Sequence, residues 1–69
     1  GHRSGTRELL HVLAGTVDLV VGGTGHRLRS GDSASFDGAV PHSYRNASAA
    51  RAARFSLAVH EPAVTREIP

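Results

Sequence analysis

The fold is decided by two stretches of the sequence: residues 8–15, which read ELLHVLAG, and residues 31–46, which read GDSASFDGAVPHSYRN. In the longer stretch, turn signals at Gly31-Asp32 and Asp37-Gly38 enclose one short strand-like run. Pro41 then fixes the backbone at the start of a second run. Short runs between turns of this kind predict β-strands joined by tight connections.

The rest of the chain continues this pattern, with a turn signal every eight to ten residues or so. Regular short strands separated by Gly, Asp, Asn and Ser are typical of an all-β sandwich or barrel. In residues 16–21 the apolar side chains alternate with polar ones, as expected of a strand with one buried face. The predicted strands are residues 6–13, 16–21, 25–28, 33–36, 42–46 and 52–60.

The first predicted strand is apolar on both faces, with Leu10 and Val12 on one side and Leu9 and Leu13 on the other. A strand of this kind is covered on both sides. The chain has 69 residues and no cysteine, so its core is small and no disulfide reinforces it. We therefore expect a homodimer in which a partner covers the second face.

The charges argue against a nucleic-acid-binding surface. All eight basic residues are arginines spread along the chain, and six acidic residues leave a net charge of +2. Nucleic-acid surfaces concentrate positive charge and add stacking aromatics, whereas this chain has one tyrosine and two phenylalanines. We expect no direct nucleic-acid contact, no membrane segment and a cytoplasmic location.

Two groups of polar residues share strand faces. Because residues two apart in a strand point to the same side, His2, Ser4 and Glu8 can face one cavity, and so can His42 and Tyr44. A carboxylate combined with imidazoles is a common ligand set for Fe, Mn, Ni or Zn. The same residues also suit a polar pocket for a small molecule.

These spacings resemble the two motifs of the cupin superfamily. In the first motif a His-x-His pair precedes a Glu, and a Gly follows after six intervening residues; here His2, Ser4, Glu8 and Gly15 occupy those places. In the second motif, Gly31, His42 and Asn46 fall in register. Asp37 and Ala39 replace the usual Pro and Gly of that motif. The resemblance implies a small double-stranded β-helix, the cupin or jelly-roll barrel.

In cupins the metal is held by the histidines and glutamate of the first motif and the histidine of the second. The resemblance therefore implies His2, Glu8 and His42 as ligands of one divalent transition metal (Fe, Mn, Ni or Zn), with Ser4 a poor ligand. The alternative is a metal-free ligand cavity lined by Glu8, His42, Tyr44 and Ser4, with Glu8 and His42 hydrogen-bonded to each other.

The remaining polar residues have simpler interpretations. His11 has the opposite parity to Glu8 and should point away from the cavity, while His26 and His60 should be exposed. Asn46 is expected to tie a turn, and residues 47–53 to form a loop despite their alanines. Gly22-Gly23 is typical of a hairpin and not of a phosphate-binding loop.

A closer likeness concerns function. Residues 5–13, 31–33 and 41–46 resemble the C-terminal cupin domain of bacterial regulators that carry an N-terminal helix-turn-helix. This implies a single domain over residues 1–69, with a core of about residues 6–60, that belongs to a longer chain and senses a small-molecule effector. The alternative is a stand-alone metal-dependent cupin enzyme of the dioxygenase, isomerase or decarboxylase type. A storage or structural barrel is a third possibility, for which no residue argues.

Overall fold

A computed structural model describes residues 5–60, which form six β-strands and no helix. This confirms the all-β prediction. The strands are β1 (Arg7–Ala14), β2 (Thr16–Val21), β3 (Thr24–Arg29), β4 (Ser33–Asp37), β5 (His42–Asn46) and β6 (Arg54–His60).

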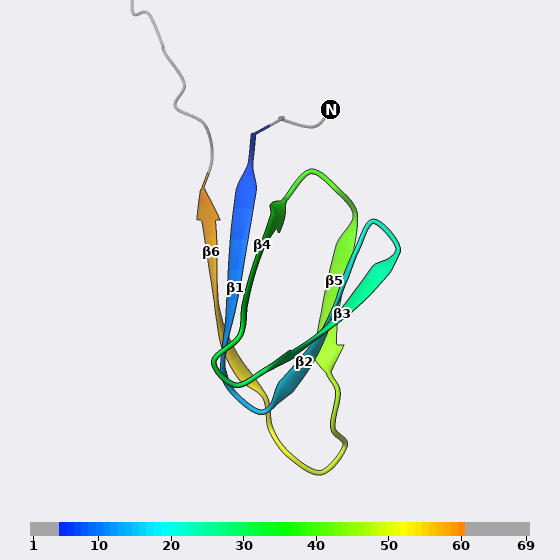
Figure 1. Ribbon diagram of the computed structural model, residues 1–69, viewed down its shortest axis with the longest axis vertical. Helices are drawn as coiled ribbons and strands as arrows, with labels where there is room; N and C mark the ends of the chain where they lie inside the picture. The colour runs from blue at the N-terminus through cyan, green and yellow to red at the C-terminus, as the bar shows by residue number, and fades with distance from the viewer. Residues whose placement is uncertain (1–4, 61–69) are drawn as a thin grey trace, which may run out of the picture.

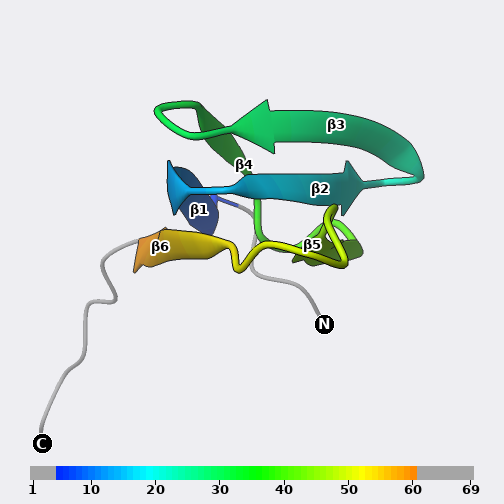
Figure 2. The ribbon, with the colours of Figure 1, turned by 90° about the horizontal axis from the view of Figure 1, so that it is seen from below.

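The strands form two antiparallel sheets of three, which lie face to face (Figure 1). One sheet has the order β4-β1-β6 and the other the order β3-β2-β5. Figure 2 shows that β3 and β4 flank one side of the sandwich, while β5 and β6 flank the other. The edges of the two sheets therefore meet along two seams, one between β3 and β4 and the other between β5 and β6. The molecule is a small jelly-roll barrel.

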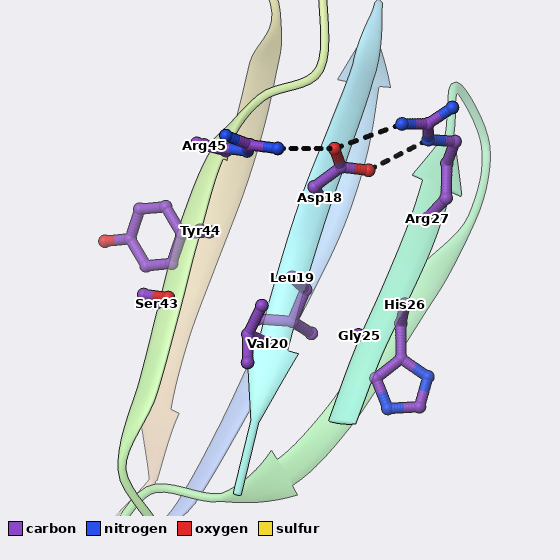
Figure 3. Close-up of a pocket in the computed structure, with 9 residues that line it drawn as sticks. All are labelled: Asp18, Leu19, Val20, Gly25, His26, Arg27, Ser43, Tyr44 and Arg45. Atoms are coloured by element: carbon purple, nitrogen blue, oxygen red, sulfur yellow. Dashed lines mark hydrogen bonds and ion pairs between the residues drawn. The ribbon is translucent and has the colours of Figure 1, made fainter. Parts of the chain in front are cut away.

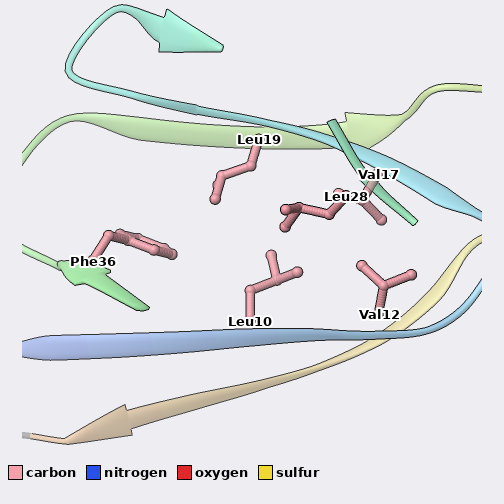
Figure 4. Packing of buried hydrophobic residues seen from close by; sticks show 6 residues of the cluster. All are labelled: Leu10, Val12, Val17, Leu19, Leu28 and Phe36. Carbon is pink, nitrogen blue, oxygen red and sulfur yellow. The ribbon is translucent and has the colours of Figure 1, made fainter. Parts of the chain in front are cut away.

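The core follows from strand parity. Leu10 and Val12 of β1 face Val17 and Leu19 of β2, and all four are at most 1% exposed. Leu28 and Phe36 complete the cluster (Figure 4). Six buried apolar side chains make a small core, as expected for a chain of this length.

The β2–β3 connection is a hairpin, as predicted from its glycines, and its loop has two residues. Val21 pairs with Thr24, and Gly22 and Gly23 have φ values of 56° and 84°. Two successive positive φ angles are those of a type I′ turn, whose twist matches that of the flanking strands. The hairpin therefore holds β2 and β3 in register.

The closed end of the sandwich is built around Gly15, which joins β1 to β2. Its φ is +78°, and a Cβ atom there would lie 2.6 Å from the Ala52 carbonyl oxygen and 2.9 Å from the Ala53 Cα. Ala52 and Ala53 pass close to Gly15 just before β6 begins. The pairing of β6 with β1 is accordingly irregular between Val12 and Ala14. This explains why β6 starts at Arg54 and not at residue 52 as predicted, while the other strand ends differ from prediction by at most one residue.

The opposite end is more open. Along the inward face of β6, Phe55 is partly buried, Leu57 is 37% exposed and Val59 is 58% exposed. On the outer face of the first sheet, Leu9 and Leu13 are 46% and 47% exposed. Within residues 5–60 there is no helix long and apolar enough to cross a lipid bilayer.

Candidate functional site

Glu8 is the one charged residue of the described chain that is classed as buried, with 8% exposure. It lies near the start of β1, paired across the sheet with Phe36 of β4 and Val59 of β6. Since antiparallel partners point to the same side, its carboxylate faces the interior beside apolar side chains. A carboxylate buried in this way needs a polar partner.

That partner is His42, at the start of β5 in the other sheet. His42 Nε2 lies 3.1 Å from Glu8 Oε2, and His42 Nδ1 lies 2.8 Å from the Val40 carbonyl oxygen. The structure thus places the Glu8 carboxylate and the His42 ring next to each other, with 3.1 Å between Oε2 and Nε2. This contact joins the two sheets at the open end of the sandwich.

Both acceptors around the His42 ring need a proton from it. A carboxylate and a carbonyl oxygen can only accept, so the ring satisfies both only when each nitrogen carries a hydrogen. With one proton, the ring donates either to Val40 or to Glu8. The pair therefore places one carboxylate and one imidazole side by side in an otherwise apolar interior.

Two neighbours shape this pair and were not identified as site residues from the sequence. The Phe36 ring lies against the His42 ring, with 5.0 Å between centroids and a tilt of 59°. Gly38 lies against Glu8, because a Cβ at residue 38 would come within 2.7 Å of Glu8 Oε2. The only sequence signal for Gly38 was the Asp37-Gly38 turn, which gave no hint of a contact with β1.

The turn that delivers His42 departs from the cupin motif at Asp37 and Ala39. Asp37 Oδ1 accepts a hydrogen bond from the Ala39 N–H at 2.9 Å, and the Asp37 carbonyl accepts one from the Val40 N–H at 3.1 Å. An aspartate that bonds its own backbone two residues later stabilises a turn without proline. The Val40 carbonyl is thereby positioned to hold the His42 ring.

Three further residues were predicted from the sequence to line the site: His2, Ser4 and Tyr44. His2 and Ser4 lie outside the described residues. Tyr44 shares the inward face of β5 with His42, but it is 41% exposed and its ring packs edge-on against Phe55, 5.0 Å between centroids. It therefore lines the seam between β5 and β6 and is not a buried core residue.

The predictions for Asn46 and His11 are confirmed. Asn46 ties the following loop through Nδ2, which donates to the Arg51 carbonyl at 2.7 Å, and Oδ1, which accepts from the Ser48 N–H at 2.9 Å. His11 points away from the interior, with Nδ1 2.6 Å from Ser33 Oγ on the outer face. Residues 47–53 form a loop, as expected.

The Glu8–His42 geometry suits part of the predicted metal site. Two donors bound at about 2.1 Å and at right angles to each other lie about 3.0 Å apart, close to the 3.1 Å observed between Nε2 and Oε2. The Val40 carbonyl would fix the orientation of the His42 ring, as outer hydrogen bonds do for metal-bound histidines. Within residues 5–60, however, no group of three or more potential ligand side chains comes together.

A separate hollow of about 740 Å³ lies over the second sheet, β3-β2-β5. The outer face of this sheet carries an ion-pair network (Figure 3). Asp18 Oδ1 and Oδ2 accept from Arg27 Nε and Nη2 at 2.9 and 3.2 Å, and Arg45 Nη2 lies 3.9 Å from Oδ2. The hydrogen bond from Arg27 lowers the pKa of Asp18 and raises that of Arg27. These arginines are thus engaged on a solvated strand face.

Comparison with known proteins agrees with this architecture. A family model described as "Cupin domain" matches residues 1–60. Neither the search of curated proteins nor that of solved structures gave a match.

Proposed function

The chain belongs to the cupin family, and on that premise we propose that it is the small-molecule-sensing domain of a cytoplasmic bacterial transcriptional regulator whose DNA-binding domain is not among these residues. The observation that carries the proposal is the close Glu8–His42 contact, with 3.1 Å between Oε2 and Nε2, in an otherwise apolar interior. A carboxylate and an imidazole that lie together in apolar surroundings offer a few convergent polar groups to a small molecule, as ligand-binding sites do.

The likeness of residues 5–13, 31–33 and 41–46 to the C-terminal cupin domain of helix-turn-helix regulators supports this proposal. These residues include both members of the pair, Glu8 and His42. In such a regulator the effector binds inside the barrel. A change at the Glu8–His42 link, which connects the two sheets, would then alter how the barrel meets its partners.

A metal-dependent cupin enzyme is the second candidate, because the spacing of Glu8 Oε2 and His42 Nε2 fits two neighbouring ligands. Glu8 and His42 would hold the metal, with His2 as the third ligand implied by the motif. A divalent metal bound there supplies Lewis-acid or redox chemistry. Phe36 would exclude water from one side, and the Val40 carbonyl would keep the His42 ring in place.

Metal content decides between the two candidates. We would measure Fe, Mn, Ni and Zn by elemental analysis in the wild-type protein, in Glu8→Ala and His42→Ala, and in His60→Ala as a control for loss of an exposed histidine. The sensor proposal expects substoichiometric metal in all four proteins. Close to one equivalent in wild type and His60→Ala, lost from the other two, would establish the enzyme's metal centre and contradict the proposal.

We further propose that the domain is a homodimer that buries the outer face of the first sheet. Leu9 and Leu13 lie on that face of β1, and Ala58 lies beside Leu9 on β6. Leu9→Glu should convert a dimer into a monomer in sedimentation at micromolar concentration, since a buried charge opposes association. Val20→Glu, a matched change on the outer face of the second sheet, should leave the dimer intact. A monomeric wild-type protein would contradict the proposal.

A further inference from the structure

The seam between β3 and β4 opens into a cleft of about 450 Å³ whose lining includes neither Glu8 nor His42. Figure 2 shows these two strands on the same side of the sandwich. The floor of the cleft is apolar and consists of core-facing side chains from both sheets: Leu19, Val21, Leu28, Ala34 and Phe36. A volume in this range and an apolar floor are typical of small-molecule sites.

One wall of the cleft is the free edge of β4, which contributes backbone groups. The Ser33 and Ser35 side chains are on the outer face, where they bond His11 and Arg7. The Gly38 N–H donates to the Thr6 carbonyl, so the even-numbered residues of β4 bond to β1. In an antiparallel ladder the intervening residues then direct their N–H and C=O groups away from that partner. The amides of Ser33 and Ser35 therefore face the cleft.

The opposite wall is β3, which contributes His26. His26 pairs with Leu19 across β2, so its imidazole is on the inward side of the sheet, and it is exposed at the rim. Thr24 adds a hydroxyl on the same face, and no acidic side chain lines the cleft. The rim therefore carries N–H groups, a hydroxyl and an imidazole as hydrogen-bond donors, beside the carbonyl groups of the same β4 edge. With no acidic side chain nearby, these donors can hold one anionic end of a ligand whose flat apolar body covers the floor.

We propose that the β3–β4 cleft binds a small aromatic carboxylate, with the ring system against the partly buried Val21 and Ala34 and the carboxylate at His26 and the outward-facing amides of β4. The cleft contains neither Glu8 nor His42, so this inference does not rest on the proposed function. The two sites share one wall, because the Phe36 ring that lines the cleft also packs on His42.

The test uses 2-naphthoate as the probe and 2-naphthalenemethanol as its uncharged analogue. Binding is followed by NMR titration of the leucine and valine methyl groups in the full chain. We expect saturable shifts at Leu19, Val21 and Leu28, with the acid binding at least tenfold more tightly than the alcohol. No saturation by either compound, equal affinity for both, or shifts confined to Leu9 and Val20 on the outer faces would overturn the proposal.

Substitutions inside and outside the cleft test where the naphthoate probe binds. His26→Ala, at an exposed position, should weaken naphthoate binding at least fivefold and leave the alcohol unchanged, whereas His60→Ala on the outer face of β6 should affect neither. Ala34→Leu should fill the cleft and abolish binding of both compounds, with methyl dispersion as the check on folding. An equal loss in His26→Ala and His60→Ala contradicts the site.

Glu8→Ala separates this inference from the proposed function. If the cleft is the binding site, Glu8→Ala should change the naphthoate dissociation constant by less than twofold. Loss of binding in Glu8→Ala with retention in Ala34→Leu would place the carboxylate at the Glu8–His42 pair. That result would overturn the cleft inference while leaving the sensor proposal standing.

Discussion

The two ends of the sandwich are built from the same strands but differ in how tightly they pack. At the closed end, Val12 and Val17 are fully buried and the chain crosses Gly15 with no room for a side chain. At the open end, the same two sheets are joined by the Glu8–His42 contact, and Val59 of β6 is largely exposed. The difference indicates that the closed end provides stability, while the open end keeps the polar groups accessible.

The largest effect is expected from Gly15→Ala at the closed end. The new Cβ would clash with backbone atoms of Ala52 and Ala53, and the residue would keep a positive φ. We expect a loss of about 3 kcal/mol or more of unfolding free energy, enough to unfold a domain this small. Gly23→Ala is the control, since Gly23 has a φ of +84° but nothing within 4 Å of its Cβ position. If chemical denaturation gave equal losses of unfolding free energy for Gly15→Ala and Gly23→Ala, the positive φ, and not crowding by Ala52 and Ala53, would be what matters at Gly15.

A matched pair of leucines tests how packing changes across the first sheet. Leu10 and Leu57 face each other across β1 and β6, but Leu10 is 0% exposed and Leu57 is 37% exposed. Leu10→Ala should cost about 3 kcal/mol of unfolding free energy, and Leu57→Ala about 1 kcal/mol. Similar costs in urea denaturation would mean that Leu57 is covered in solution, for example by a partner molecule at the β5–β6 seam.

The contact between Gly38 and Glu8 predicts a coupling at the open end. Gly38→Ala should displace the Glu8 carboxylate from His42 and cost about 1–2 kcal/mol of unfolding free energy. In a Glu8→Ala background the same change should cost about 1 kcal/mol less, because the displaced group is gone. A double-mutant cycle by denaturant unfolding measures the difference. Strict additivity would show that Gly38 does not position Glu8.

The smallest effect is expected on the solvated face of the second sheet. Asp18→Asn removes the ion pair with Arg27 and should lower the Tm only slightly at neutral pH, less so in 1 M salt. Because the pKa of Asp18 is lowered in the folded protein, its contribution is complete above the unfolded-state pKa of about 3.9. That contribution disappears as the pH falls through the lower native value. A Tm difference that persists at pH 2 would contradict this origin.

Local patterns were sufficient to predict the strands and part of the site. The turn at Gly22-Gly23, the alternation in β2 and the loop after Asn46 depend on interactions between near neighbours, and the structure has all three. Parity within each strand also predicted that Glu8 and His42 face one interior. The cupin motif spacing then indicated that they meet.

Contacts between distant segments could not be predicted in this way. The approach of Gly38 to Glu8, the packing of Phe36 on His42 and the crossing of Ala52 over Gly15 depend on how the sheets are stacked. No alternation or turn signal encodes that stacking. The β3–β4 cleft was missed for the same reason, because it exists only where the edges of two different sheets meet.

The strand order also has a consequence for how the chain reaches its fold. β2 and β3 pair through a two-residue turn, whereas Arg7 of β1 pairs with His60 of β6, at the opposite end of the described chain. Hairpins close within microseconds, but contacts between distant residues must first overcome the entropy of closing a long loop. During synthesis, the β2–β3 hairpin can therefore form early, while the edge of β1 that pairs with β6 stays unpaired until β6 has left the ribosome. The step most vulnerable to aggregation is thus the interval before β6 arrives, and not any event in the finished barrel.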